Sequence, residues 1–433
     1  MILESKKQII NFVNEYKKTL KVKINKSKFS NLKSWEVSDK NIRHSSGGFF
    51  SIIGLDVKTN YGNVFHWQQP IIKQNEIGIL GFISKIIEDK RYFLVQCKTE
   101  PGNINFVQLS PTVQATKSNY FQKHGGIKPH YLDFFLDVNK KVLVDQIQSE
   151  QGARFYKKRN RNIVVEVYEE IKLKNNFFWT SLESLVDCLQ IDNLVNMDTR
   201  TVLSSLLFID KKLTYNPSPD FGFATKQLLH WMVKLKCNYE LDTNEMPLKT
   251  LDSWVFSENQ IKHISEKYFK VIPVQVLIEG REVKEWCQPM IESAQSGLCA
   301  FIIKKINNKY HFLVQGKVEC GNLDVIEMAP TVQCLTGEYK GIKSEMLPFL
   351  KYVLNSKNKI IDNFQSEEGG RFFREENRNV IVQANEDEAF ELPENYIWVT
   401  LSQLSFLITF NNIVNVQARN LVSYFVTKED VYG

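Results

Sequence analysis

The sequence predicts an α+β protein made of two tandem homologous modules, each with a mixed sheet and flanking helices. Three observations support this fold class. The 433-residue chain repeats itself, period-2 and β-branched runs recur in both copies, and each copy ends in apolar-periodic helices. Strands and helices do not alternate regularly along the chain, which argues against a doubly wound parallel sheet.

The repeat is visible when the chain is aligned with itself at an offset of 219 positions. A later segment matches at an offset of 217, so the two copies differ by a two-residue gap. The matched segments are Trp67–Pro70 with Trp286–Pro289, Phe93–Ile104 with Phe312–Leu323, Pro111–Gln114 with Pro330–Gln333, and Ser149–Ile163 with Ser366–Val380.

The repeat and the composition between its copies predict the domain organisation. We expect an amphipathic N-terminal helix over 1–20, a first module over 21–210 and a second module over 225–433. Residues 211–224 contain the Pro, Asn, Ser and Gly typical of a linker.

Within each module, short β-branched or alternating runs predict strands, and polar capping signals predict helices. The expected strands are Tyr92–Lys98, Asn105–Leu109, Val142–Ile147 and Ile163–Val167, with partners His311–Lys317, Asp324–Met328, Lys359–Phe364 and Val380–Gln383. Capping boxes at Thr180–Glu183 and Thr400–Gln403 are each expected to open a helix, and second helices are expected over Thr199–Ile209 and Ala418–Val426.

Composition narrows the class of protein. The 29 Phe, 16 Tyr and 7 Trp exclude extended disorder, and no run approaches the ~18 apolar residues of a membrane span. The net charge of +6 is too weak to indicate a nucleic-acid partner, but it fits a small anionic ligand. The N-terminus lacks the features of a signal peptide, and the seven Cys form no C-x-x-C, so we expect a cytoplasmic protein without disulfides.

Several motifs are absent from the sequence. It contains no G-x-G-x-x-G, no G-x-x-x-x-G-K-[ST] and no G-x-S-x-G, so dinucleotide, P-loop and serine-hydrolase sites are not expected. The spacing of His124 and His130 matches no standard metal geometry. We therefore expect neither a metal nor a cofactor.

Gln96, Lys98 and Glu100 alternate along one predicted strand and its exit, so they share a face. One interpretation is a structural ion pair, because a buried Lys or Glu needs a partner. The other is a pocket wall in which Lys98 and Glu100 move or stabilise a proton. The second module repeats the pattern as Gln315, Lys317 and Glu319, which fits either interpretation.

Thr112 and Gln114 follow a strand-breaking proline and are expected on one face, where an amide can hydrogen-bond a base or sugar. A solvent-facing edge strand is the alternative. Residues 115–126 then differ between the copies: Ser118, Asn119, His124 and the pair Gly125-Gly126 have no obvious equivalents, and Tyr120 lies in the same segment. This loop predicts a catalytic pocket in the first module, and a merely variable surface loop is the alternative.

A basic cluster follows Ser149. Arg154 and Arg161 offer bidentate geometry to phosphate oxygens, and Asn160 can bond a base or ribose. The alternative is a structural role or a solvated face. Residues 374–376 of the second copy are Arg-Glu-Glu, and this acidic replacement argues against a nucleic-acid surface.

The segments W-Q-Q-P, L-V-Q-C-K-T-E-P-G-N, S-P-T-V-Q-A-T-K-S-N-Y, S-E-Q-G-A-R-F and N-R-N resemble the NDP-hexose 2,3-dehydratase family, over nearly the whole chain. The resemblance implies a substrate such as dTDP-4-keto-6-deoxyglucose, Nudix-like modules, a homodimer and no metal requirement. The Nudix catalytic box is absent from the sequence, which agrees with a lost hydrolase activity. A metal-dependent Nudix-type hydrolase and a non-catalytic nucleotide-sugar-binding protein remain the alternatives.

The chemistry of that substrate suggests roles for the candidate residues. We expect Glu100 or His124 to be the acid or base, Lys98 or Tyr120 to polarise the C4 oxygen, and Arg154 and Arg161 to bind the diphosphate. The other candidates for binding are Trp67, Gln96, Thr112, Gln114, Ser118, Asn119 and Asn160, and the second-module equivalents are Trp286, Lys317, Glu319, Gln333, Arg371 and Arg378. The first module is the expected catalytic one, while the second either binds nucleotide without turnover or serves as architecture.

Overall fold

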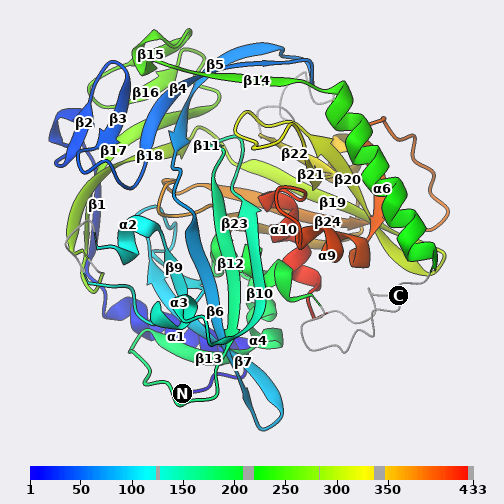
Figure 1. The fold of residues 1–433 in the computed structure, drawn as a ribbon, viewed down its shortest axis with the longest axis horizontal. Coiled ribbons are helices and arrows are strands. Elements are labelled where there is room, and N and C mark those ends of the chain that lie inside the picture. The colour runs from blue at the N-terminus through cyan, green and yellow to red at the C-terminus, as the bar shows by residue number, and fades with distance from the viewer. Residues whose placement is uncertain (123–126, 208–218, 282, 336–346, 428–433) are drawn as a thin grey trace.

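The computed structural model describes residues 1–122, 127–207, 219–281, 283–335 and 347–427. Within these residues the chain forms four sheets with short helices packed among them, which confirms the predicted α+β class (Figure 1). No helix of the described residues is long and apolar enough to cross a lipid bilayer.

Each module contains one seven-stranded sheet, and the two sheets have the same topology. In the first, the order is β10-β12-β6-β7-β13, with β8 beside β7 and β9 beside β6. In the second, the order is β23-β24-β19-β20-β25, with β21 beside β20 and β22 beside β19. The β12–β6 and β24–β19 pairs are parallel and the other pairs are antiparallel, so both sheets are mixed, as predicted.

The bounds of these strands follow the repeat closely. They are β6 Gly78–Ile87, β7 Lys90–Thr99, β8 Val107–Ser110, β9 Val113–Ala115, β10 Lys141–Ser149, β12 Arg159–Glu166 and β13 Phe177–Ser181, then β19 Gly297–Ile306, β20 Lys309–Lys317, β21 Glu327–Pro330, β22 Val332–Leu335, β23 Lys359–Ser366, β24 Glu376–Gln383 and β25 Tyr396–Thr400. The strands predicted in this region are therefore confirmed, with boundaries that differ by a few residues.

Two smaller sheets exchange strands between the modules. Near the N-terminus, β1 pairs with β17 of the second module, with Ile24 opposite Val276. Reciprocally, β14 pairs with β4 of the first module, with Thr243 opposite Val57, and it spans the top of the molecule in Figure 1. The sheets are formed by β2 Trp35–Val37, β3 Asn41–His44, β4 Ser51–Thr59, β5 His66–Lys73, β11 Phe155–Tyr156 and β14 Leu241–Met246, and by β1 Val22–Lys26, β15 Trp254–Phe256, β16 Ile261–His263, β17 Phe269–Ile278 and β18 Glu285–Ser293.

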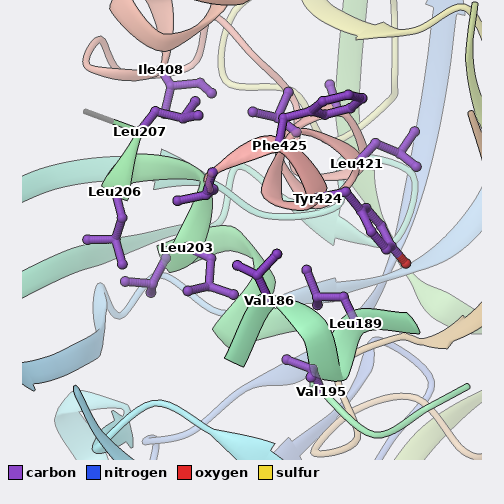
Figure 2. Packing of buried hydrophobic residues seen from close by; sticks show 14 of the residues in the cluster. Val186, Leu189, Val195, Leu203, Leu206, Leu207, Ile408, Leu421, Tyr424 and Phe425 are labelled. Carbon is purple, nitrogen blue, oxygen red and sulfur yellow. The ribbon is translucent and has the colours of Figure 1, made fainter. Parts of the chain in front are cut away.

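Helices from the two modules share one hydrophobic core, because their apolar faces are buried against each other. Figure 2 shows Leu207 of the first module beside Ile408 of the second, and Leu203 belongs to the same cluster as Leu421 and Phe425. The α-helices are α1 Lys6–Lys18, α2 Lys117–Tyr120, α3 Asp133–Leu136, α4 Leu182–Asp187, α5 Met197–Leu203, α6 Pro219–Asn238, α8 Leu350–Asn355, α9 Leu401–Ile408 and α10 Val416–Val422. Short 3₁₀ turns cover Phe29–Asn31, Cys188–Gln190, Ser204–Leu206, Leu248–Thr250 and Ser423–Phe425.

Two fully buried arginines tie the modules together. Arg419 of α10 donates a hydrogen bond from Nη2 to the carbonyl oxygen of Ser149, at 2.5 Å. Its counterpart Arg200 of α5 donates in the opposite direction, to the carbonyl oxygen of Ser366. Because removal of either guanidinium would leave a buried carbonyl unpaired, these contacts hold the modules in one arrangement.

The two predicted capping boxes differ in outcome. The capping box at Thr400 is confirmed, but α4 is capped by Ser181, whose hydroxyl accepts from Ser184 N, rather than by Thr180. Thr180 lies in β13, where its hydroxyl donates to Leu3 O at 2.7 Å. The box at Thr180 was placed one residue too early, because the Thr180 hydroxyl donates to Leu3 O and the next residue, Ser181, is the cap. Of the expected linker, residues 211–218 lie outside the described residues and 219–224 belong to α6.

Candidate active site

The repeated motifs of the two copies meet across the module boundary. Gly102 N donates to Gly369 O at 2.7 Å, and Gly321 N donates to Gly152 O at 2.7 Å. A Cβ at Gly102 would lie 1.6 Å from the carbonyl oxygen of Phe372, so this close approach requires glycine. The contact places the exit of β7 against the loop between β23 and β24.

A cavity of about 220 Å³ lies beside this contact, and side chains of both modules line it. Those central to its chemistry are Lys98, Glu100, Glu150, Lys158 and Asp198 of the first module, and Arg281, Trp286, Glu368 and Arg371 of the second. A concave site with aromatic walls and a few convergent polar groups is where a small ligand is expected to bind.

Glu100 is held by one cation from each module. Its Oε1 lies 3.1 Å from Lys98 Nζ and 3.0 Å from Arg281 Nη1. Burial raises the pKa of the Glu100 carboxyl, but Arg281 and Lys98 outweigh it and lower the pKa to about 2. Glu100 is therefore a fixed anion at neutral pH, and it holds the two cations at the cavity wall.

Three other buried carboxyls line the cavity and behave in the opposite way. Burial, reinforced by Glu368 and Glu150, raises the pKa of Asp198 well above its usual value. Burial and the nearby Glu368 also raise the pKa of Glu150, and burial raises the pKa of Glu368 itself. Several carboxyls that share one dry site do not all ionise together, so the set contains both proton donors and acceptors near neutral pH.

Local structure fixes the position of each carboxyl. Asp198 lies in the first turn of α5, which Asn196 caps by accepting from Thr199 N. Glu150 accepts from Asn160 Nδ2 at 2.8 Å, and Glu368 accepts from Gly370 N at 2.9 Å. Their geometry is therefore set by backbone and amide contacts before a substrate binds.

A basic side chain faces the same carboxyls. Lys158 is 6 % exposed, and its Nζ donates to the carbonyl oxygens of Glu76 and, at 3.1 Å, Arg159. Burial lowers the pKa of Lys158, while Glu150 acts in the opposite direction. Lys158 and Glu150 are thus poised to share a proton.

The second module supplies further groups able to bind a ligand. The Arg371 guanidinium lies 4.2 Å from the ring centroid of Phe50, and its Nη2 donates to Gln74 Oε1 at 3.4 Å. Within the described residues, Gln74 Nε2 and Arg371 Nε are buried without a hydrogen-bond partner. Buried donors of this kind are costly unless something pairs with them, so they indicate a polar ligand in the cavity.

The loop that distinguishes the first copy supports the cavity rim. Ser118 N donates to Glu76 Oε2 at 2.9 Å, and Phe49 N donates to Ser118 Oγ at 2.9 Å. Phe49 has a φ of +62°, a conformation that costs energy for a non-glycine residue, and its ring packs 4.7 Å from that of His44. Ser118 therefore positions the aromatic rim of the cavity.

The structure brings some of the residues singled out from the sequence to this cavity and leaves others elsewhere. Those that line it are Lys98, Glu100, Gln114, Asn119, Asn160, Trp286 and Arg371. Gln114 accepts from Lys98 Nζ through its carbonyl oxygen at 3.0 Å. His124 lies outside the described residues.

The two first-module arginines expected at a diphosphate have other partners. Arg154 stacks over Phe269 at 4.3 Å, and Arg161 forms a bidentate pair with Asp145 at 2.7 and 2.6 Å. Neither is among the described residues that line the cavity. Arg378 repeats the Arg161 pair with Asp362, at 2.6 Å for both contacts.

The remaining candidates make structural contacts. Trp67 Nε1 donates to Gln69 Oε1 at 2.9 Å, the Thr112 hydroxyl bonds to Leu94 O, and Tyr120 OH donates to Ile77 O at 3.4 Å. Gln96 lines a separate, smaller cavity. In the second module, Gln333 Nε2 donates to Glu319 Oε1 at 2.8 Å, and Lys317 Nζ donates to Gln333 O at 3.4 Å.

Sequence reasoning missed Asp198, Glu150, Lys158, Arg281 and Glu368, although all five line the cavity. A comparison of the copies holds a signal for some of them, because 198 aligns with Gln417 and 158 with Glu375. Arg281 also differs between the copies, because it aligns with Gly62, but that difference does not show which residues it contacts. It reaches the cavity through a contact between modules, which spacing along the chain does not reveal.

Buried carboxyls of raised pKa beside fixed cations define an acid–base enzyme site for an anionic substrate. Among the described residues, no three His, Cys, Asp or Glu side chains are grouped so that they could hold a metal ion. The chain belongs to the NDP-hexose 2,3-dehydratase family, whose model matches residues 6–206 and 225–425. The two matched regions confirm the internal repeat.

Relatives from three bacteria are each named dTDP-4-dehydro-6-deoxy-alpha-D-glucopyranose 2,3-dehydratase. The protein of Saccharopolyspora spinosa is 42% identical, over 92% of this chain and 87% of its own. That of Amycolatopsis orientalis is 39% identical, over 91% and 84%, and that of Streptomyces violaceoruber is 38% identical, over 94% of each chain.

Proposed function

We propose that this protein removes water across C2 and C3 of dTDP-4-keto-6-deoxyglucose, giving a 3,4-diketo-2,6-dideoxy sugar nucleotide for deoxysugar biosynthesis. The observation that supports this best is the set of carboxyls with raised pKa, Asp198, Glu150 and Glu368, beside the cations Lys98 and Arg281. Membership of the family and the names of the relatives support the same reaction.

The substrate sets three chemical requirements. The C4 ketone acidifies the C3 proton, because the resulting anion is an enolate, so a base must accept that proton. A cation or hydrogen-bond donor must stabilise the enolate oxygen, and an acid must protonate the C2 hydroxyl, which otherwise leaves poorly. The enol product takes a solvent proton at C2 to reach the diketone.

We assign the proton steps to the carboxyls of raised pKa. Asp198 is held in its neutral form most strongly and donates a proton to the departing C2 hydroxyl. Glu150, in proton exchange with Lys158, accepts the C3 proton. Glu100 was expected as acid or base, but a carboxyl with a pKa of about 2 is a weak base and is ionised at neutral pH.

The cations take the complementary tasks. Lys98, fixed by Glu100 and by the carbonyl of Gln114, stabilises the C4 oxygen as charge develops there. Arg371 and Arg281 bind the diphosphate, because both guanidinium groups line the cavity from the second module. Trp286 offers an aromatic face for the base or sugar, and the unpaired Nε2 of Gln74 offers a hydrogen bond.

Two expectations that came with the family resemblance are retained as proposals. We infer that each module has the fold of a Nudix hydrolase and that the protein acts as a homodimer. We also propose a cytoplasmic location, which the cysteines and the N-terminus predict. Analytical ultracentrifugation tests the assembly: a species of twice the 50.5 kDa chain mass is expected, and a monomer at assay concentration contradicts it.

The function is tested by incubating the purified protein with dTDP-4-keto-6-deoxyglucose in deuterium oxide and following the sugar by mass spectrometry. We expect loss of one water and one solvent deuterium at C2 of the product. A parallel reaction with EDTA distinguishes a Nudix-type hydrolase, which would cleave the diphosphate in a metal-dependent way. Unchanged sugar nucleotide, or nucleotide release that EDTA abolishes, contradicts the proposal.

A further inference from the structure

A second cavity lies behind the cation pair of the active site. It encloses about 100 Å³, and Lys98 and Arg281 line it as well as the larger cavity. Its other walls come from Tyr16 of α1, from the end of β7, from residues 127, 128 and 130, and from residues 278–281. The volume suits a small ion rather than a sugar nucleotide.

Charged side chains around this second cavity are mostly basic. Lys128 and His130 line it with Lys98 and Arg281, and Glu279 is the acidic residue of the lining. Glu279 is itself neutralised, since its carboxylate oxygens lie 3.6 Å from Lys21 Nζ and 3.0 Å from Lys284 Nζ. Lys128 pairs with the exposed Asp133. The local balance is therefore positive and favours an anion.

A buried hydroxyl also indicates a ligand. Thr99 lines the second cavity and is 3 % exposed, and within the described residues its Oγ1 has no hydrogen-bond partner. A buried hydroxyl without a partner is costly, and an anion in the cavity would accept a hydrogen bond from it.

We propose that this second cavity is a binding site for a phosphate-sized oxyanion, separate from the sugar-nucleotide site and coupled to it through Lys98 and Arg281. An anion there shares these two cations with Glu100, and so weakens their attraction for a substrate diphosphate on the other side. By thermodynamic linkage, the substrate weakens anion binding by the same factor as the anion weakens substrate binding. Because both ligands can be bound at once, the loss of substrate affinity stops growing when the anion site is full. The coupling rests on the proposed function, whereas anion binding does not.

Binding is tested on the full chain with inorganic phosphate as the probe, by isothermal titration at constant ionic strength. We expect saturable binding by wild type, weakened about tenfold in Thr99→Val and about threefold in Lys128→Ala. Lys90→Ala is the matched control, because Lys90 is a comparably exposed lysine that pairs with Glu183, remote from this cavity. No binding, or equal binding by wild type and Thr99→Val, overturns the proposal.

Steady-state kinetics with the keto sugar nucleotide test whether phosphate binds outside the sugar-nucleotide site. The apparent KM is expected to rise with phosphate and then level off, since substrate and anion bind together. Thr99→Val and Lys128→Ala are expected to keep basal turnover and lose this response at moderate phosphate. A KM that rises without limit means that phosphate competes inside the sugar-nucleotide site, which overturns the proposal. Phosphate binding without any dehydration contradicts the proposed function alone.

Discussion

Glu100 and its counterpart Glu319 occupy the same position in the two modules, but their carboxyl pKa values are shifted in opposite directions. Arg281 and Lys98 lower the pKa of Glu100 to about 2 against the effect of burial. Burial raises the pKa of Glu319, although Lys317 and Arg154 act against it. The position that matches Arg281, 219 residues earlier, is Gly62. Arg281 of the opposite module is thus the largest influence that lowers the pKa of Glu100, and Gly62 has no charge with which to do the same for Glu319.

The proton-transfer groups differ in the same way. Asp198 aligns with Gln417, whose Nε2 donates to Glu367 Oε1 at 2.9 Å, and Glu367 is the counterpart of Glu150. Two carboxyls whose charges repel each other in one module are therefore replaced by an amide–carboxyl hydrogen bond in the other. The duplicated fold thus provides two modules with equivalent backbones, and a few substitutions give one of them acid–base chemistry.

The largest effect is expected from removing the proton donor. Asp198→Asn keeps the size of the side chain but cannot donate the carboxyl proton, so kcat is expected to fall about 10²–10⁴-fold with little change in KM. Gln417→Ala is the control in the other module and is expected to change kcat less than about threefold. Steady-state kinetics of both variants decides the matter. Equal losses of kcat in the two variants would mean that the two modules are not functionally distinct.

The two glutamates are expected to differ in stability. Glu100→Gln leaves Lys98 and Arg281 without their buried counter-charge, so we expect a loss of about 3 kcal/mol in the free energy of unfolding at pH 7. Glu319→Gln replaces a carboxyl that burial already biases towards its neutral form, and the expected change is within about 1 kcal/mol. Urea denaturation measures both, and similar losses would contradict the opposite pKa shifts.

The same pair predicts opposite dependences on pH. The folded-state pKa of Glu100 is lowered, so its contribution is fully present above the unfolded-state value near 4.5 and is lost as the pH falls towards 2. The folded-state pKa of Glu319 is raised, so wild type incurs a cost above pH 4.5 that Glu319→Gln avoids. Unfolding free energies of the three proteins between pH 3 and 8 test both signs, and parallel curves would refute them.

The smallest effect on catalysis is expected from Ser118, which positions the aromatic rim of the larger cavity and has no obvious equivalent in the second copy. Ser118→Ala removes the hydroxyl that accepts from Phe49 N, so Phe49 is held less firmly in its left-handed conformation. We expect KM to rise about threefold to tenfold with kcat nearly unchanged, since the hydrogen bonds of this hydroxyl with Phe49 N and with Glu76 are lost away from the reacting atoms. Ser118→Thr is expected to restore part of the affinity. A change in kcat alone would argue against a positioning role.

Much of the fold could be predicted because the evidence is local. Strand periodicity located β7 and β12, and the offset between copies revealed the duplication. The alternation of Lys98 and Glu100 correctly predicted that the two side chains lie together. The exchange of β1 and β14 was not predictable, because pairing between distant strands leaves no signal in a local pattern.

Only part of the candidate site could be predicted from the sequence, for the same reason. Arg154 and Arg371 stand in nearly identical motifs and stack over the equivalent rings of Phe269 and Phe50, and only the tertiary arrangement shows that Arg371 lines the cavity. Asp198 looked like an ordinary acidic residue in the first turn of a helix. Its raised pKa arises from burial and from Glu368 of the other module, neither of which is visible in one sequence.

The central claim is that one cavity, built from both modules, holds the keto sugar between Asp198 and Lys98. A crystal structure of Asp198→Asn with dTDP-4-keto-6-deoxyglucose tests it most directly, because slow turnover preserves the substrate. We expect the C2 hydroxyl within hydrogen-bonding distance of residue 198, the C4 oxygen at Lys98 Nζ and the diphosphate at Arg371 and Arg281. A sugar bound only beside Glu319 and Arg154 would contradict the account.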